Sequence, residues 1–262
     1  MCLIALAWQV SSHWPLIVAA NRDEAYGRAT LPAQQWRDHP EVYGGRDLLE
    51  GGSWLALTTS GRLAAVTNVR EPGSNAAARS RGHLVRDFLL GDGGAQSAAL
   101  QAAAQGDAYR PFNLLLFDGR ELACATNRPR LTAATLPPGI HGISNGPVDA
   151  PWPKVRWLVA SLQHWIARLP SGDEAPDTAA LFAALASEQR AAPEELPGTG
   201  VPPALEWRLS APFIRGDTYG TRASTVLLID RAGRATLIER GFGPGAAPLG
   251  ERRIVVATAR GR

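Results

Sequence analysis

The second residue of the chain, Cys2, is the side chain with the clearest potential for chemistry. A small residue after Met1 predicts that Met1 is removed, which leaves Cys2 with both a thiol and a free α-amine. An α-amine has a pKa of roughly 7.7–8.0, so it is partly neutral near pH 7 and accepts the thiol proton. Cys2 is therefore a candidate N-terminal nucleophile, and a buried core cysteine is the alternative that its position alone favours.

A polar motif follows the first hairpin. The apolar segment 16–20 runs directly into Asn21, Arg22 and Asp23, without a glycine or proline to reverse the chain. We expect Asp23 to orient the terminal amine and the thiol. Arg22 is placed to hold an acidic group or to brace a neighbouring carboxylate. A solvated strand end with a local ion pair is the alternative.

Two asparagines also stand at the ends of apolar segments. Asn68 ends the segment 63–68, and Asn145 follows the segment 139–144. A side-chain amide at such a position can donate a hydrogen bond to a developing oxyanion, and losing one such donor costs roughly 3–4 kcal/mol in catalysis. An asparagine that satisfies nearby backbone groups in a turn is the alternative for both.

A last polar motif, which runs from Tyr219 to Arg222, precedes the segment 224–230. Arg222 beside a thiol would favour the thiolate and would bind an anionic group of a substrate. A surface arginine at a strand start is the alternative. No His, Cys and carboxylate set has the spacing of metal ligands, so we expect no metal site.

The composition predicts a soluble globular protein of the cytoplasm. The chain has 262 residues, 45% of them hydrophobic, which suits one domain over residues 1–262. No apolar run approaches the roughly 20 residues that span a membrane, and no signal peptide is recognised. Two cysteines fit a reducing compartment. The net charge of +3 comes from scattered arginines, so nucleic-acid binding is not expected.

The apolar pattern predicts hairpins and helices in separate groups. Hairpins are expected over residues 3–20, 54–68, 113–126 and 224–240, with strands at 139–144 and 254–258. Helices are expected over residues 82–90, 95–105, 153–168 and 177–190, and residues 193–203 read as a surface loop. This grouping favours antiparallel sheets with helices packed outside them.

Taken in order, these motifs resemble those of the NRDE family, also called the transport and Golgi organisation 2 family. The matching residues cover nearly the whole chain: Met1-Cys2, Ala19-Ala20-Asn21-Arg22-Asp23-Glu24, Gly51-Gly52-Ser53-Trp54-Leu55, Thr67-Asn68, Phe112-Asn113-Leu114, Ser144-Asn145, Trp152-Pro153-Lys154 and Tyr219-Gly220-Thr221-Arg222.

The resemblance implies an N-terminal-nucleophile hydrolase, an α+β fold in which two antiparallel sheets lie between helix layers (αββα). Such a fold resembles that of the cholylglycine and penicillin-V amidases. By resemblance, Cys2 is the nucleophile, and Asp23, Asn68, Asn145 and Arg222 complete the catalytic set.

We expect Asn21, Arg22 and Tyr219 to bind the substrate. Those amidases carry an arginine at the position of Ala20, so the resemblance departs from their pattern there. We expect Arg22 to point to the strand face opposite the one that position 20 occupies.

The implied reaction is hydrolysis of a linear, non-peptide amide through a Cys2 acyl-enzyme, with no required cofactor. The alternative is a haem- or lipid-handling protein on the same fold, in which Cys2 ligates haem; the five histidines show no haem motif. A structural module whose tryptophans line an apolar cavity is a third possibility. The expected partner is a small amide or apolar ligand, and a homo-oligomer is compatible with the fold.

Overall fold

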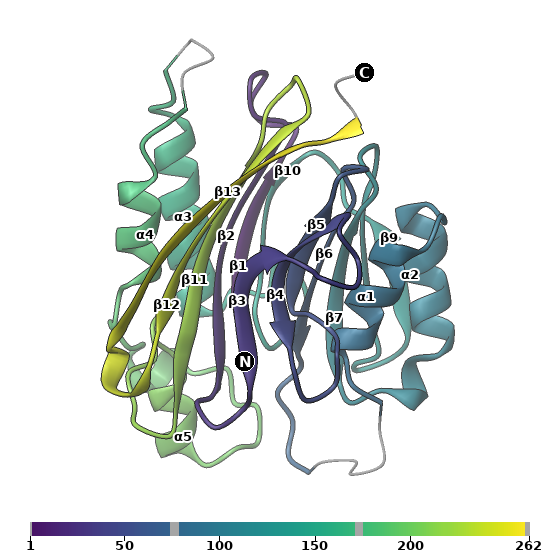
Figure 1. Cartoon of the computed structure of the whole chain (residues 1–262). Coiled ribbons are helices and arrows are strands. Elements are labelled where there is room, and N and C mark those ends of the chain that lie inside the picture. The colour runs from purple at the N-terminus through teal and green to yellow at the C-terminus, as the bar shows by residue number, and fades with distance from the viewer. Residues whose placement is uncertain (1, 74–78, 171–174, 260–262) are drawn as a thin grey trace.

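The computed structural model describes residues 2–73, 79–170 and 175–259. Two antiparallel β-sheets pack face to face, and helices cover the outer face of each sheet (Figure 1). The chain is therefore an α+β sandwich of four layers, which confirms the fold class expected from the sequence.

The first sheet has six strands in the order β10-β1-β2-β11-β12-β13. The sheet contains the first hairpin that the sequence predicts, and β1 lies between β10 and β2 with every residue buried. The strand bounds are β1 Cys2–Trp8, β2 Leu16–Ala25, β10 Gly139–Ile143, β11 Tyr219–Ile229, β12 Arg234–Phe242 and β13 Pro248–Ala257.

The second sheet has seven strands in simple sequence order, β3 to β9. The β7–β8 turn forms as expected, because the Asp118 carboxylate accepts hydrogen bonds from the backbone N–H groups of Arg120 and Glu121. The strand bounds are β3 Thr30–Gln35, β4 Val42–Asp47, β5 Leu55–Thr58, β6 Leu63–Asn68, β7 Phe112–Phe117, β8 Leu122–Thr126 and β9 Thr132–Thr135.

The helices form the two outer layers. Helices α1 (Gly82–Leu90) and α2 (Ala95–Ala104) cover the second sheet, and α3 (Pro153–Ile166) and α4 (Ala179–Leu185) cover the first (Figure 1). A short helix, α5 (Pro203–Arg208), follows the proline-rich loop. Among the described residues, no helix is long and apolar enough to cross a membrane.

Three apolar layers hold the sandwich together. Because side chains alternate along a strand, Ile4 and Leu6 of β1 point between the two sheets, whereas Leu3 and Ala5 point towards α3. A third cluster packs α1 and α2 on the second sheet. A strand with apolar residues on both faces is fully covered, and β1 therefore holds its first residue, Cys2, in a fixed place.

The structure departs from the expected elements in the polar motif. Strand β2 continues through it to Ala25 instead of ending before Asn21. The Asn21 Nδ2 donates to the carbonyl oxygens of Leu185 and Pro212, and its Oδ1 accepts from the Ser224 hydroxyl. Partners from distant parts of the chain thus satisfy a polar side chain inside a strand.

Strands β3, β4 and β9 were not expected, and α4 ends earlier than the predicted helix over residues 177–190. In β3 only Ala33 is buried, and β9 has no buried residue. Edge strands of this kind carry little apolar alternation, which is the signal that sequence reading relies on.

Candidate active site

A cavity of about 330 Å³ lies beside Cys2, at the end of the sandwich where β1, β2 and β6 meet. Four of the residues singled out in the sequence line it: Cys2, Arg22, Asp23 and Asn68. The other four, Asn21, Asn145, Tyr219 and Arg222, do not line it. The structure thus brings half of the predicted site together around the candidate nucleophile.

Cys2 is held from behind and is nearly closed off from solvent. Its side chain is 9% exposed, and its carbonyl oxygen accepts a hydrogen bond of 2.8 Å from the Ser144 hydroxyl. Burial raises the pKa of the Cys2 thiol, because a thiolate is poorly solvated inside the protein. The thiol is therefore neutral near pH 7, and it needs a base to become a nucleophile.

Arg22 lies on the same strand face as Cys2, which corrects the expectation from the sequence. Positions 20 and 22 are two residues apart, so both point to one side, and Arg22 is the direct cross-strand partner of Cys2. Its guanidinium stacks 4.3 Å from the centre of the Trp54 ring and lies 4.0 Å from the Glu24 carboxylate. Arg22 is therefore the arginine that accompanies the thiol.

Asp23 lies level with the N-terminal side of Cys2, where the backbone nitrogen of this residue is found. The pairing of Cys2 with Arg22 sets this register. The Oδ1 of Asp23 accepts a hydrogen bond of 2.7 Å from the Thr221 hydroxyl of β11, and Asp23 is 1% exposed. Burial raises the pKa of the Asp23 carboxyl.

Asn68 lines the cavity, and Asn145 holds it in place by hydrogen bonds from the buried side. The Asn145 Nδ2 donates to the carbonyl oxygen and to the Oδ1 of Asn68, both at 3.0 Å. Because the Oδ1 of Asn68 is an acceptor here, its Nδ2 is the end left to donate into the cavity. Asn145 itself is fully buried and does not reach the cavity, which corrects its assignment as an oxyanion donor.

The orientation of the Asn145 amide is set in turn by Arg70. The Arg70 guanidinium donates to the Asn145 Oδ1 at 3.3 Å, and the Arg70 backbone N–H donates to the Asn145 carbonyl oxygen at 2.8 Å. A buried carboxylate, that of Glu206, lies 3.8 Å from the same guanidinium. A chain of contacts thus runs from Glu206 through Arg70 and Asn145 to Asn68.

A second buried charge lies behind Asp23. Lys154, the single lysine of the chain, is 3% exposed, and its Nζ donates to the Leu209 carbonyl oxygen at 3.1 Å. Burial lowers the pKa of Lys154 from 10.5 to about 8, and the negative charge of Asp23 opposes this change. The ammonium and the carboxylate balance each other in a region without solvent.

Tyr219, predicted to bind substrate, lies outside the cavity. Burial, with the charge of Asp23 as the next cause, holds the pKa of its phenol well above the ordinary value. Tyr219 is thus a neutral side chain near the buried charges.

Arg222 also lies elsewhere, and this corrects the prediction that it stabilises the thiolate. Its guanidinium donates to the carbonyl oxygens of Ala25 and Arg28 and lies 5.9 Å from the Tyr26 ring centre. It lines a separate cavity of about 120 Å³ between β3 and β11. Asn21 likewise does not line the cavity of Cys2, because its side chain makes three hydrogen bonds on the helix side of the sheet.

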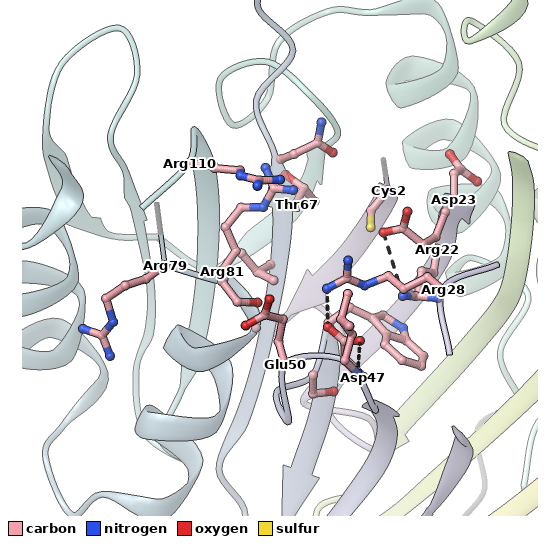
Figure 2. Close-up of a pocket in the computed structure, with 18 residues that line it drawn as sticks. Cys2, Arg22, Asp23, Arg28, Asp47, Glu50, Thr67, Arg79, Arg81 and Arg110 are labelled. Atoms are coloured by element: carbon pink, nitrogen blue, oxygen red, sulfur yellow. Dashed lines mark hydrogen bonds and ion pairs between the residues drawn. The ribbon is translucent and has the colours of Figure 1, made fainter. Parts of the chain in front are cut away.

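Several residues that line the cavity were not singled out in the sequence. Arg28 and Asp47 form an ion pair of 2.6 Å on the side of Cys2, and Trp54 is half-buried there. Arg81 and Arg110 lie on the opposite side (Figure 2). The position of Arg81 just before the predicted helix over residues 82–90 is a weak sequence signal for a site residue, and the sequence around Arg110 gives no such signal.

The arrangement combines a buried thiol, an amide donor directed into a polar cavity and arginines on both sides. These are the parts that acyl transfer needs: a nucleophile, a donor for an oxyanion and groups that hold a substrate. Among the described residues, no group of three or more His, Cys, Asp or Glu side chains could hold a metal ion.

Comparison with known proteins was made for sequence and structure. A family model described as "Transport and Golgi organisation 2" matches residues 1–244. The chain is 35% identical to the Transport and Golgi organization protein 2 homolog of Bos taurus over 258 residues, and 33% identical to that of Homo sapiens over 256 residues. Each match covers 92% of both proteins.

Two solved structures are similar to this chain at lower sequence identity. A Caenorhabditis elegans N-acylethanolamine-hydrolyzing acid amidase ortholog superimposes with a TM-score of 0.48 and 11% identity, over 87% of this chain and 92% of that one. A mutant of the conjugated bile acid hydrolase from Clostridium perfringens superimposes with a TM-score of 0.45 and 10% identity, over 97% of this chain and 92% of that one.

Proposed function

The chain belongs to the Transport and Golgi organisation 2 family, and for this member we propose hydrolysis of a linear amide by an N-terminal cysteine. The observation that carries the proposal is the shared cavity of Cys2 and Asn68, a thiol and a directed amide donor. The proposal requires removal of Met1, which leaves the Cys2 α-amine as the base.

In the proposed reaction the Cys2 sulfur attacks the amide carbonyl carbon while the α-amine takes the thiol proton. The raised pKa of the buried thiol makes this base necessary at neutral pH. The carbonyl oxygen becomes an oxyanion, which the Nδ2 of Asn68 stabilises by a hydrogen bond.

Collapse of this intermediate breaks the C–N bond, and the α-ammonium gives its proton to the leaving nitrogen. A thioester on Cys2 remains. Water, deprotonated by the same amine, then releases the acyl group as a carboxylic acid and restores the thiol.

Two charged residues support the α-amine and the thiol. Asp23 is placed to orient the α-amine, because it lies level with the N-terminal side of Cys2. Arg22 on the same strand face places a positive charge beside the thiol, which favours the thiolate as it forms.

Haem binding, the alternative from the sequence, finds little support in the cavity. Haem needs a broad apolar slot and an axial ligand, whereas charged side chains dominate this lining, and no histidine is among the described residues that line it. Cys2 is the one candidate ligand there, and it is 9% exposed. No step of the proposal involves haem.

The experiment follows amine release and the mass of the Cys2 peptide with short N-acyl amides. We expect a thioester adduct on Cys2 and loss of hydrolysis in Cys2→Ala, by about 10³-fold or more. Cys124→Ala is the matched control, because Cys124 lies in β8 outside the cavity. Full hydrolysis by Cys2→Ala would overturn the proposal.

A further inference from the structure

The side of the cavity that faces Cys2 carries two arginines. Arg81 precedes α1 and Arg110 precedes β7, and both line the cavity opposite Cys2 and Arg22 (Figure 2). Among the residues that the structure describes, neither is joined to a carboxylate by an ion pair. We refer to this pair as the arginine wall.

Three of the four acidic residues that line the cavity have hydrogen-bond or ion-pair partners outside the arginine wall. Asp47 forms an ion pair with Arg28 at 2.6 Å. Glu24 lies 4.0 Å from Arg22 and accepts a hydrogen bond from the Ala25 backbone N–H, and Asp23 accepts one from the Thr221 hydroxyl. Burial opposes the charge of Arg28, but the hydrogen bond to Asp47 and the nearby carboxylates raise the pKa of its guanidinium. The carboxylates thus compensate the arginines beside Cys2.

Arg81 and Arg110 are close enough to affect each other. Burial lowers the pKa of the Arg81 guanidinium, and the charge of Arg110 adds to this effect. One Arg81 nitrogen donates to the Pro111 carbonyl oxygen at 3.0 Å, which leaves most of its five N–H donors for another acceptor. Two neighbouring guanidinium groups repel each other unless an anion lies between them.

From this geometry we propose that Arg81 and Arg110 bind an anionic group, a carboxylate or a phosphate monoester, on the amide that Cys2 cleaves. Arginine presents a planar fork of donors that matches either group. The inference rests on the proposed hydrolysis and names its substrate class: a polar, charged amide, and not a purely apolar lipid amide. A cavity of about 330 Å³ with largely charged walls suits such a molecule.

The first experiment compares four amides that share a four-carbon acyl group or its charged analogue. N-butyrylethanolamine is the neutral reference, N-butyrylglycine carries a carboxylate on the amine side, and N-succinylethanolamine carries it on the acyl side. N-butyrylphosphoethanolamine replaces the carboxylate with a phosphate. We expect at least one charged amide to exceed the neutral one in kcat/KM by about tenfold or more.

Variants then assign this preference to the arginine wall. Arg81→Gln and Arg110→Gln should lower kcat/KM for the charged amide about tenfold more than kcat/KM for the neutral amide, and so remove the preference. Arg253→Gln is the matched control, because Arg253 is exposed on β13 in the other sheet. Equal losses on charged and neutral amides, or no preference in the unmodified protein, would overturn the inference.

A binding measurement separates this inference from the proposed hydrolysis. Phenylglyoxal modifies guanidinium groups, and peptide mass spectrometry reports the rate at each arginine. Butyl phosphate or butyrate should slow modification of Arg81 and Arg110 but not of Arg253, even if no amide is cleaved. Unchanged rates at Arg81 and Arg110 would contradict the anion subsite whether or not Cys2 is catalytic.

Discussion

The two sides of the cavity are built in different ways. Cys2, Arg22, Asp23 and Asn68, which we call the sheet wall, stand on strands β1, β2 and β6. Hydrogen bonds from Ser144, Thr221 and Asn145 hold Cys2, Asp23 and Asn68 from behind. The arginine wall stands on loops, and the bond from Arg81 to the Pro111 carbonyl oxygen is the one side-chain hydrogen bond that it makes to the described residues.

This difference separates two roles. A chemical step requires atoms fixed to within a fraction of an ångström, and the sheet wall supplies that rigidity. Recognition of a charged group tolerates more freedom, and long arginine side chains on loops provide it. Changes in the sheet wall should therefore lower kcat for every substrate, whereas changes in the arginine wall should affect charged substrates more than neutral ones.

The largest effect short of removing Cys2 itself is expected at Asn68. In Asn68→Ala the oxyanion loses its side-chain donor, and kcat should fall by about 10²–10³-fold with little change in KM. The fall should be the same for charged and neutral amides. Asn68→Asp, which keeps the size but replaces the donor, should be equally impaired. An Asn68→Ala enzyme with normal kcat would place the oxyanion elsewhere.

The next effect concerns the buried Lys154 behind Asp23. Its pKa is lowered to about 8, so between pH 8 and its ordinary value of 10.5 the unfolded chain holds a proton that the folded chain lacks. The free energy of unfolding should therefore rise with pH across this window, by up to about 3 kcal/mol. Below pH 8 both states are protonated and the contribution is constant.

Urea unfolding at several pH values would measure this slope. The matched variant is Lys154→Met, which keeps the length of the side chain and has no proton to lose. The difference in stability between the two proteins should change over pH 8–10.5 and be flat below it. Parallel pH profiles would mean that Lys154 titrates normally.

A smaller effect is expected at Arg70, two contacts away from the cavity. Arg70→Gln removes the charged donor to the Asn145 Oδ1, so the amide that orients Asn68 is less well fixed. We expect kcat to fall by about tenfold while KM stays constant. Arg70→Lys, which keeps the charge near Glu206, should recover part of kcat. Equal changes in kcat and KM would instead indicate a disturbed cavity.

The smallest effect is expected at Arg222, the arginine that the sequence placed beside the thiol. Arg222→Gln removes hydrogen bonds to two backbone carbonyl groups outside the cavity of Cys2. Its cost should fall on stability, by about 1 kcal/mol, with hydrolysis changed less than about twofold. Thermal unfolding and steady-state kinetics of the same preparation would check both. A loss of hydrolysis as large as that of Asn68→Ala would return Arg222 to the site.

More of the fold and of the sheet wall than of the rest of the site could be predicted from sequence patterns. Apolar alternation and turn residues such as Asp118 mark hairpins, and a polar residue at the end of a buried strand stands out locally. Cys2 and Asn68 are of this kind, and Asp23 follows an apolar run within β2. Their signal lies within a few residues of sequence.

The remaining features depend on contacts between distant segments. Asn145 and Asn68 have similar local contexts, and their different roles follow from a contact across 77 positions of sequence. Arg110 joins the site because the loop before β7 packs beside the start of α1, which no periodicity reveals. The edge strand β3, with a proline and one buried residue, lacks the pattern of a strand altogether.

The central claim is that removal of Met1 turns a buried, neutral thiol into an assisted nucleophile. The most direct measurement is the rate of iodoacetamide labelling of Cys2 against pH, in protein with and without Met1, by peptide mass spectrometry with Cys124 as internal reference. Burial raises the pKa of both thiols, so neither has an advantage of its own.

The account predicts that Cys2 of the trimmed protein is labelled much faster than Cys124, with a rate that follows a group of pKa roughly 7.7–8.0, the α-amine. The untrimmed protein should show no such advantage. Cys2 labelling that is as slow as that of Cys124 in the trimmed protein, or equal in both forms, would contradict the claim.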